Sequence, residues 1–384
     1  MSSATPTPAH TDFGTLWGHP RPLWMLFMAE FWERFAFYGI RWALTLYIVS
    51  EFYNGNASGE GDANRYYGAY LALVYATAIF GGYVADRVIG YQRSILLGAV
   101  VMSIGLFMIM VPHKEVFLLG LAVIVVGNGL FKPNISSLVG QLYAQGDDRR
   151  DRGFTIFYMG INIGGLLSPL ATSWLASYWF GTPQHANYKV VFAAAGVGML
   201  LSTIWFFLGR KQLKGIGEAP ADKPAAKMLA YVITGVILAV PVVYFLMAGL
   251  GAEILAWILG GLFIIVAFML LAEGKKTGTV QLHRVYALLI LFAFNVTFWM
   301  FFEQAGSSFN FLANNLVNRD LFGDGSYVVP TGWFQSINSA AIILFAPIIS
   351  YIWYVTSKMS MEPSIPRKFA FGLLGNALGF LVLM

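Results

Sequence analysis

The sequence predicts an all-α membrane protein. Of its 384 residues, 58% are hydrophobic and only 11% are charged, whereas soluble domains carry about 25% charged residues. Apolar runs of around 20 residues recur along the chain, the length that a helix needs to cross a bilayer and too long for the strands of outer-membrane barrels. We therefore expect several spanning helices.

The first 21 residues precede the apolar runs. They are rich in serine, threonine and proline and lack the basic and then apolar layout of a cleaved signal peptide. We expect residues 1–21 to form a mobile cytoplasmic tail. Glycine, proline and charge clusters then divide residues 22–209 into a predicted bundle of six helices, near residues 22–51, 66–87, 92–111, 115–143, 152–179 and 187–209.

A polar segment at residues 210–227 contains several glycines, prolines and lysines and is predicted to be a cytoplasmic linker. Two strongly apolar helices follow within residues 228–273. Residues 284–384 are predicted to form part of a second bundle, with helices near 284–315, 331–356 and 367–384. Because transporters are commonly built from repeated halves, this arrangement predicts an incomplete design of six, two and six helices, truncated after the ninth core helix.

The basic residues predict the orientation of the chain. With alternating loops, seventeen lysines and arginines fall on the side of the N-terminus and four on the other, while three lie inside spans. Since cytoplasmic loops carry most of the basic residues, we expect a cytoplasmic N-terminus in a plasma membrane, the inner membrane of a bacterium. The same distribution explains the net charge of +5 without a nucleic-acid partner.

Four charged residues interrupt the first predicted helix: Glu30, Glu33, Arg34 and Arg41. Each charge at the centre of a membrane costs about 2.5–3.5 kcal/mol on insertion scales, so this helix needs a polar cavity or partner helices. The four positions share one face of the helix. Glu30 and Arg34 are spaced to pair, which leaves Glu33 to find another partner or to take up a proton. The alternative is a buried ion network with a purely structural role.

Lys132 lies in the middle of the fourth predicted helix, between glycines and Pro133. An amine at that depth requires a counter-charge, and the carboxylates of the first helix are the nearest candidates. Glu303 is the one acid in the middle of the seventh core helix, and we expect it to oppose the basic face, with Arg34 as its counter-ion.

Other polar and aromatic residues within spans are candidates for a binding site. Asn162 and Asn338 can donate and accept hydrogen bonds at a substrate, although amides also join helices in membranes. Tyr38, Tyr75 and Trp299 are candidates to line a pocket, although single aromatic residues also serve as core or interfacial anchors.

Asp86 and Arg87 stand at the predicted cytoplasmic end of the second helix. An acid near a helix C-terminus is disfavoured by the macrodipole unless it meets a cation or a neighbouring helix N-terminus. These two residues are therefore candidate gate residues, and the alternative is a static turn.

Several function classes find little support in the sequence. Cysteine is absent, which excludes disulfides and thiolate metal sites. The five histidines fall in the tail, in loops or at span ends, and no cluster of metal ligands or nucleophile–base pair is evident. We therefore expect neither a metal nor an enzyme. A membrane-embedded enzyme or receptor remains a distant alternative.

Three ordered motifs resemble those of the proton-dependent oligopeptide transporter family, in the major facilitator superfamily. Glu30-x-x-Glu33-Arg34-Phe is similar to its first-helix signature. Gly81-Gly82-x-x-Ala85-Asp86-Arg87 is similar to the signature between its second and third helices, and Phe157-Tyr158-x-x-Ile161-Asn162-x-Gly164 to that of its fifth helix. Lys132, Trp299-x-x-x-Glu303 and Gln335-Ser-x-Asn338 extend the likeness along the chain.

The resemblance implies a symporter that imports di- and tripeptides with protons by alternating access between two six-helix halves, with no cofactor besides the coupling protons. It implies that Arg34 and Lys132 attract the peptide carboxylate and that Asn162 and Asn338 bind its backbone or amino end. Tyr38, Tyr75 and Trp299 would shape side-chain pockets. The proton-coupling residues would be Glu30, Glu33, Arg34, Lys132 and Glu303. An alternative is a relative that moves another anionic or zwitterionic solute, such as nitrate or a drug-like molecule.

Overall fold

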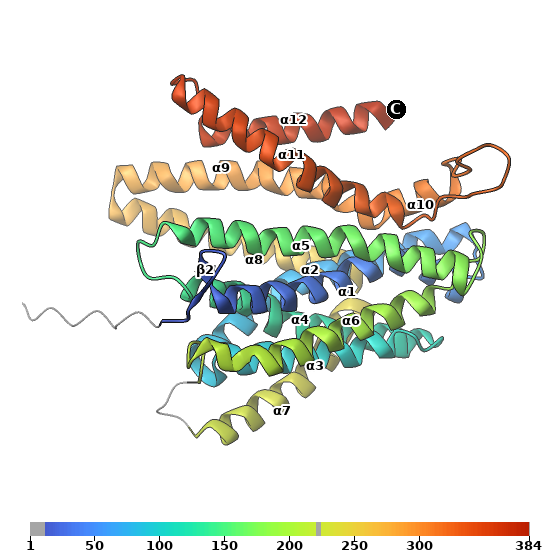
Figure 1. The fold of residues 1–384 in the computed structure, drawn as a ribbon, viewed down its shortest axis with the longest axis horizontal. Coiled ribbons are helices and arrows are strands. Elements are labelled where there is room, and N and C mark those ends of the chain that lie inside the picture. Colours follow the sequence, from blue (N-terminus) through green and yellow to red (C-terminus); the bar gives the residue numbers. More distant parts are fainter. Residues whose placement is uncertain (1–11, 220–223, 384) are drawn as a thin grey trace, which may run out of the picture.

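The computed structural model describes residues 12–219 and 224–383, and nearly all of them belong to helices, most of which run roughly side by side while α7 (Ala225–Tyr244) and α11 (Trp333–Lys358) are inclined (Figure 1). The prediction of an all-α fold is confirmed. The first bundle consists of α1 (Arg21–Phe52), α2 (Glu60–Val84), α3 (Tyr91–Met108), α4 (Lys114–Gln141), α5 (Arg149–Trp174) and α6 (Tyr188–Gly209). Short π-helical turns extend α2 as η2 (Ala85–Ile89) and α5 as η3 (Leu175–Trp179).

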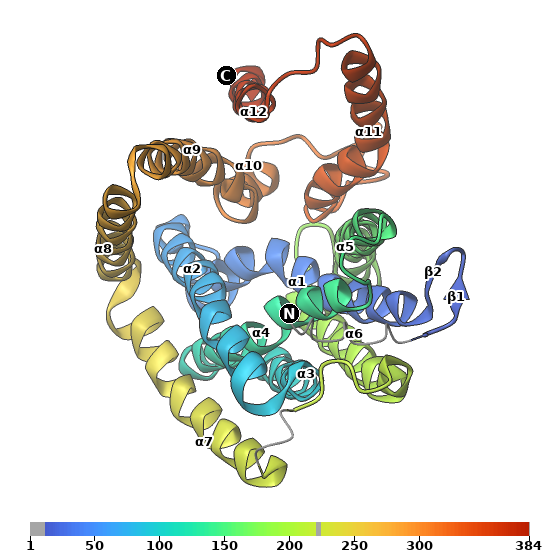
Figure 2. The same cartoon turned by 90° about the vertical axis from the view of Figure 1, so that its left-hand side faces the viewer.

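Helices α1–α6 form one packed group, seen end-on in Figure 2. Helix α1 packs against α5 and α6, and α4 packs against α2 and α3. Small residues permit the closest crossings, as is usual in membranes. At the α2–α4 crossing, a Cβ added to Gly81 would overlap the backbone carbonyl of Gly129. Most residues of α1 are buried, so its charged face lies inside the protein.

Gly81 and Gly82 provide a test of this crossing. We expect Gly81→Ala to destabilise the first bundle by about 1–3 kcal/mol, because backbone atoms cannot yield to the new methyl group. A Cβ on Gly82 meets nothing within 4 Å, so Gly82→Ala should be neutral or slightly stabilising. Thermal unfolding in detergent measures the difference. Equal melting temperatures for the two variants would contradict the crossing geometry.

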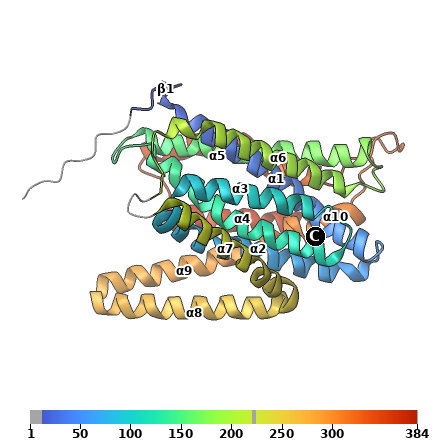
Figure 3. The ribbon, with the colours of Figure 1, turned by 90° about the horizontal axis from the view of Figure 1, so that it is seen from below.

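The remaining helices surround one side of this group. They are α7 (Ala225–Tyr244) with its π-helical turn η5 (Phe245–Gly249), α8 (Gly251–Thr277), α9 (Thr279–Phe302), α10 (Ser308–Asn315), α11 (Trp333–Lys358) and α12 (Ile365–Leu383). Helix α7 crosses the first bundle obliquely and contacts α4. Helices α8 and α9 form an antiparallel pair (Figure 3). Side chains of α7–α12 are mostly exposed to the surroundings, as expected for helices in contact with lipid.

Nine helical stretches of the described residues are long and apolar enough to cross a membrane. Helix α1 is not among them, because its charges lower its hydropathy. The seventh core helix differs from the continuous helix predicted at 284–315. Helix α9 ends at Phe302, a 3₁₀ turn η6 spans Glu303–Gly306, and α10 follows. This break places Glu303 at an irregular part of the backbone inside the protein.

The expectation of a mobile tail at 1–21 is wrong for its last part, and residues 1–11 lie outside the described residues. Strands β1 (Thr15–Leu16) and β2 (His19–Pro20) form a small antiparallel hairpin. The buried His19 ring shares a 2.9 Å hydrogen bond with the Tyr143 hydroxyl. Burial, together with Arg149 and Arg152, lowers the pKa of His19. The hairpin is therefore attached to the end of α4 and the start of α5.

The predicted linker also has structure where it is described. Residues Arg210–Leu213 form a 3₁₀ turn, η4. The Gly217 carbonyl then accepts a 2.9 Å hydrogen bond from the backbone of Gln92, and the Ile216 carbonyl accepts one of 2.7 Å from its side chain. We call the end of the molecule that carries the hairpin and residues 210–219 the linker end.

Candidate functional site

The centre of the candidate site is an ion cluster on α1, buried inside the first bundle. The Arg34 guanidinium lies 3.0 Å from the Glu30 carboxylate and also contacts Glu33. The three side chains are at most 5% exposed. The predicted pairing of Glu30 with Arg34 is confirmed, and Arg34 turns out to serve Glu33 as well. One cation therefore neutralises two acids, leaving a net negative charge if both are ionised.

Glycines on α5 allow this cluster to be enclosed. A Cβ on Gly164 would lie 2.7 Å from the Phe31 carbonyl and 3.0 Å from the Arg34 Cβ. The equivalent atom on Gly160, one turn earlier, would meet the Phe27 ring at 2.9 Å. Helix α5 thus passes close to the charged stretch of α1. The guanidinium of Arg34 also lies 5.0 Å from the centre of the Phe37 ring, a cation–π contact.

Helix α4 contributes a polar neighbour that the sequence did not single out. The amide Nδ2 of Asn128 donates a 3.3 Å hydrogen bond to Glu33 Oε1. Asn128 is 1% exposed and Glu33 is fully buried. The signal was present in the sequence, because Asn128 precedes Lys132 by four residues and so shares its helix face.

Lys132 follows one turn later on α4. Its amine lies 4.5 Å from the centre of the Tyr75 ring, and within the described part of the chain no acid lies within 4 Å of it. The acids of α1 therefore act on Lys132 as counter-charges at longer range, without a direct ion pair. Lys132 instead rests on an aromatic face, where its charge remains available to a ligand.

Glu303 is placed differently from the prediction as well. Its carboxylate accepts a 2.9 Å hydrogen bond from Arg41, not from Arg34. The reason is the break after α9, which brings η6 beside the later part of α1. This ion pair joins the first bundle to the helices that follow the linker, because its two residues are 262 positions apart in the chain.

Several hydrogen bonds join the two parts in the same half of the molecule, away from the linker end. Asn310 on α10 donates to Thr45, and on α11 the side chains of Trp333 and Ser336 donate to the carbonyls of Leu170 and Leu166. The Tyr178 hydroxyl donates to Val328, and the Tyr178 ring stacks on Tyr327. In this conformation the two parts are closed against each other at the end opposite the linker.

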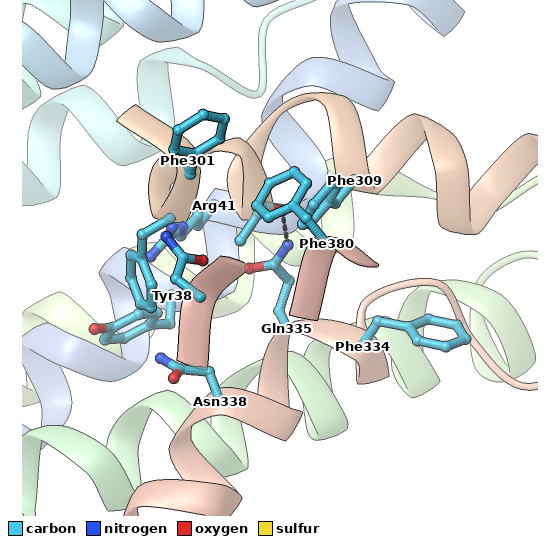
Figure 4. A pocket seen from close by; sticks show the side chains of 11 residues that line it. Tyr38, Arg41, Phe301, Phe309, Phe334, Gln335, Asn338 and Phe380 are labelled. Atoms are coloured by element: carbon cyan, nitrogen blue, oxygen red, sulfur yellow. Dashed lines mark hydrogen bonds between the residues drawn. The ribbon is translucent and has the colours of Figure 1, made fainter. Parts of the chain in front are cut away.

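A cavity of about 190 Å³ lies between α1 and the helices after the linker. Figure 4 shows Tyr38, Arg41, Gln335 and Asn338 around it, with several phenylalanines on its other sides. Of the predicted pocket residues, only Tyr38 and Asn338 line this cavity. Its remaining lining, which sequence reasoning missed, consists of Phe301, Phe302, Ala305, Phe309, Phe334, Asn376 and Phe380. The phenylalanines and Ala305 resemble ordinary apolar helix positions, whereas Asn376 is an amide within a predicted span and could have been singled out like Asn338.

Three other predicted residues lie apart from this cavity. Asn162 is buried, and its side chain donates a 2.9 Å hydrogen bond to the Tyr158 carbonyl of its own helix. Trp299 is 42% exposed and packs edge-on against Phe302. Tyr75 is half exposed beneath Lys132. The structure brings Tyr75 and Lys132 together, and it places Trp299 behind the cavity wall, in contact with the lining residue Phe302.

Asp86 and Arg87 lie in η2, at the linker end, and both are exposed. The Asp86 carboxylate accepts a hydrogen bond from the hydroxyl of Tyr91, the first residue of α3. Asp86 therefore does meet the start of a neighbouring helix. A gating role for the two residues stays a prediction.

A polytopic helical membrane protein with a buried charge cluster, and with a cavity lined by polar and aromatic side chains between two helical parts, belongs to the class of solute transporters. The profile of one such family, the POT family (PTR2), matches residues 92–384. The chain belongs to the POT family.

Individual relatives agree with this assignment. The chain is 37% identical over 376 residues to the uncharacterized transporter YclF of Bacillus subtilis, an alignment that covers 96% of this chain and 74% of the relative. It is 33% identical over 365 residues to dipeptide and tripeptide permease B of Photorhabdus asymbiotica, covering 94% and 71%. A crystal structure of a mutant of peptide transporter POT in complex with alafosfalin superimposes with a TM-score of 0.82 at 34% identity, covering 97% and 76%.

Proposed function

We propose that this protein imports di- and tripeptides together with protons by alternating access. The observation that carries the proposal is the buried cluster in which Arg34 contacts both Glu30 and Glu33. When a buried acid of this kind binds a proton, it loses its charge and releases its cationic partner. Proton binding is thereby linked to a change in contacts between helices, which is the coupling that a symporter needs. Membership of a family that includes a dipeptide and tripeptide permease supports peptides as the substrate.

Lys132 is the first contact for the peptide carboxylate, because no described acid occupies its amine within 4 Å. Arg34 becomes available when protonation of Glu30 or Glu33 releases it from one of its two partners. Substrate and proton would then depend on the same cation, so that binding of one favours binding of the other.

The rest of the site would recognise what all short peptides share. Asn338 lines the cavity beside Tyr38 and would bond the peptide backbone or amino end. Asn162 would do so once its side chain leaves the Tyr158 carbonyl. Tyr75 and Trp299 would contact substrate side chains when the two helical parts move. The proposed transport needs no cofactor besides the coupling protons and makes or breaks no covalent bond, so we propose a transporter and not an enzyme.

In the proposed orientation the N-terminus and the linker end face the cytoplasm of a bacterial cell. The excess of basic residues at that end supports this assignment. The ion pair of Arg41 with Glu303 then belongs to the closed outer half, and its separation would accompany opening to the outside. Asp86 and Arg87 would form gate contacts at the cytoplasmic end.

The experiment is uptake of radiolabelled di-alanine by proteoliposomes that contain the protein, with an imposed inward proton gradient. With one proton per peptide, a gradient of one pH unit supports accumulation of up to about tenfold. A protonophore should abolish that accumulation. If neither accumulation nor binding of di-alanine occurs, the peptide assignment is wrong. Binding of nitrate or another anionic solute in its place would favour a different substrate.

A further inference from the structure

The amide of Asn128 is placed to accompany the proton of Glu33. The Nδ2 atom of Asn128 lies 3.3 Å from Glu33 Oε1, and both side chains are buried. The other end of the amide, Oδ1, is buried without a hydrogen-bond partner among the described residues. A buried oxygen that lacks a partner is costly unless another state of the protein uses it.

An amide can serve both protonation states of a neighbouring carboxyl group. Its NH₂ donates to an ionised carboxylate, which can only accept. After a half turn about χ2, its oxygen occupies nearly the same place and accepts from the O–H of a protonated acid. No aliphatic side chain can do either, and an ionised carboxylate could only accept.

We propose that Asn128 is a positioning residue for proton coupling, which keeps Glu33 hydrogen-bonded in both of its protonation states by turning its amide. This inference rests on the proposed function, because it assigns Glu33 as an acid that takes up the coupled proton. Asn128 acts through Glu33 and touches no peptide. Without it, each protonation cycle would leave Glu33 with one hydrogen bond fewer in a dry environment.

Other groups also face Glu33. On α1 these are Arg34, in direct contact, and Glu30. The charge of Lys132 on α4 and the hydroxyl of Tyr70 on α2 interact with Glu33 electrostatically. Arg34 and Lys132 favour the ionised acid, and Glu30 opposes it. Asn128 adds a donor to the ionised form, so its removal should favour the protonated acid.

The test is the pH dependence of gradient-driven di-alanine uptake in proteoliposomes, measured for Asn128→Leu and Asn128→Asp. In Asn128→Leu, Glu33 loses the hydrogen bond from the Asn128 amide. The midpoint of the curve of uptake against pH should therefore move to higher pH by about one unit. The shift should be larger in Asn128→Asp, because a second acid disfavours ionisation of Glu33 further. Peptide exchange without a gradient should persist in both variants, which also shows that they are folded.

Asn134 provides a matched control on the same helix. It is also 1% exposed and also has an unpartnered Oδ1, but its nitrogen donates to Ser94 Oγ and to the carbonyls of Gly81 and Leu130. Asn134→Leu should lower thermal stability and leave the midpoint unchanged. An unchanged midpoint in both Asn128 variants, with normal accumulation by the wild type, overturns the inference alone. Absence of accumulation by the wild type overturns the proposed function and the inference with it.

Discussion

Glu33→Gln is expected to abolish accumulation of peptide against a gradient while peptide exchange across the membrane continues. The amide resembles the protonated acid in shape, so Arg34 keeps its remaining partner, Glu30, at 3.0 Å. The variant cannot release or bind the coupled proton at this position. Gradient-driven uptake should therefore fall from about tenfold accumulation per pH unit to equal concentrations on both sides. Counterflow of labelled di-alanine measures the exchange.

Glu51 is the matched control, because it is another acid on α1 with a cationic partner, Lys189, at 3.1 Å. This pair lies near the end of the helix and is partly exposed, so its contribution to stability is small. Glu51→Gln should accumulate di-alanine like the wild type. If Glu33→Gln loses exchange and accumulation equally while remaining folded, Glu33 has a structural role and the coupling assignment is wrong.

Lys132→Met is expected to weaken binding of peptides with a free carboxylate by roughly tenfold to one-hundredfold, the range that loss of a hydrogen bond to a charged group produces. Methionine retains an unbranched apolar side chain beside Tyr75 and removes only the charge. Peptides with an amidated C-terminus should bind the wild type weakly and lose little more in the variant. Competition against labelled di-alanine measures both affinities.

Lys114→Met tests whether any lysine on α4 matters. Lys114 also contacts aromatic rings, those of Tyr53 and Tyr66, each at 5.3 Å. It stands at the start of the helix, outside the candidate site, so binding should be unchanged. Equal losses for free and amidated peptides in Lys132→Met would contradict a role in carboxylate binding. Arg34→Ala, by contrast, should also destabilise the protein, because it leaves Glu30 and Glu33 buried without their shared cation.

Much of the fold followed from the sequence because membrane insertion imposes a simple rule. A run of about 20 apolar residues becomes a helix in lipid, since each backbone polar group must find its partner within the helix. The charged residues of α1 could also be identified as candidate site residues from the sequence, because no single helix carries four charges into lipid without partners. The local pair of Glu30 with Arg34 was predictable, since spacing along one helix decides it.

Long-range partners were not predictable in the same way. Glu303 pairs with Arg41 instead of Arg34 because the helix is broken between α9 and α10. No sequence pattern indicated that break. Lys132 on α4 lies 4.5 Å from the ring of Tyr75 on α2, a contact that depends on how these two helices pack together. The hairpin at residues 15–20 is joined by His19 to the distant Tyr143, a contact that no local sequence pattern indicates.

The sequence by itself determined that this protein spans a membrane, where its helices lie, and that the few charged residues inside them need partners. Only the tertiary structure decided which of those charges meet, because the free energy of a buried ion pair or amide contact depends on distances of a few ångströms between helices. Glu33 illustrates both contributions. Its residue type and position predicted a proton-linked acid, and the packing of α4 against α1 provided Asn128 as its hydrogen-bond partner.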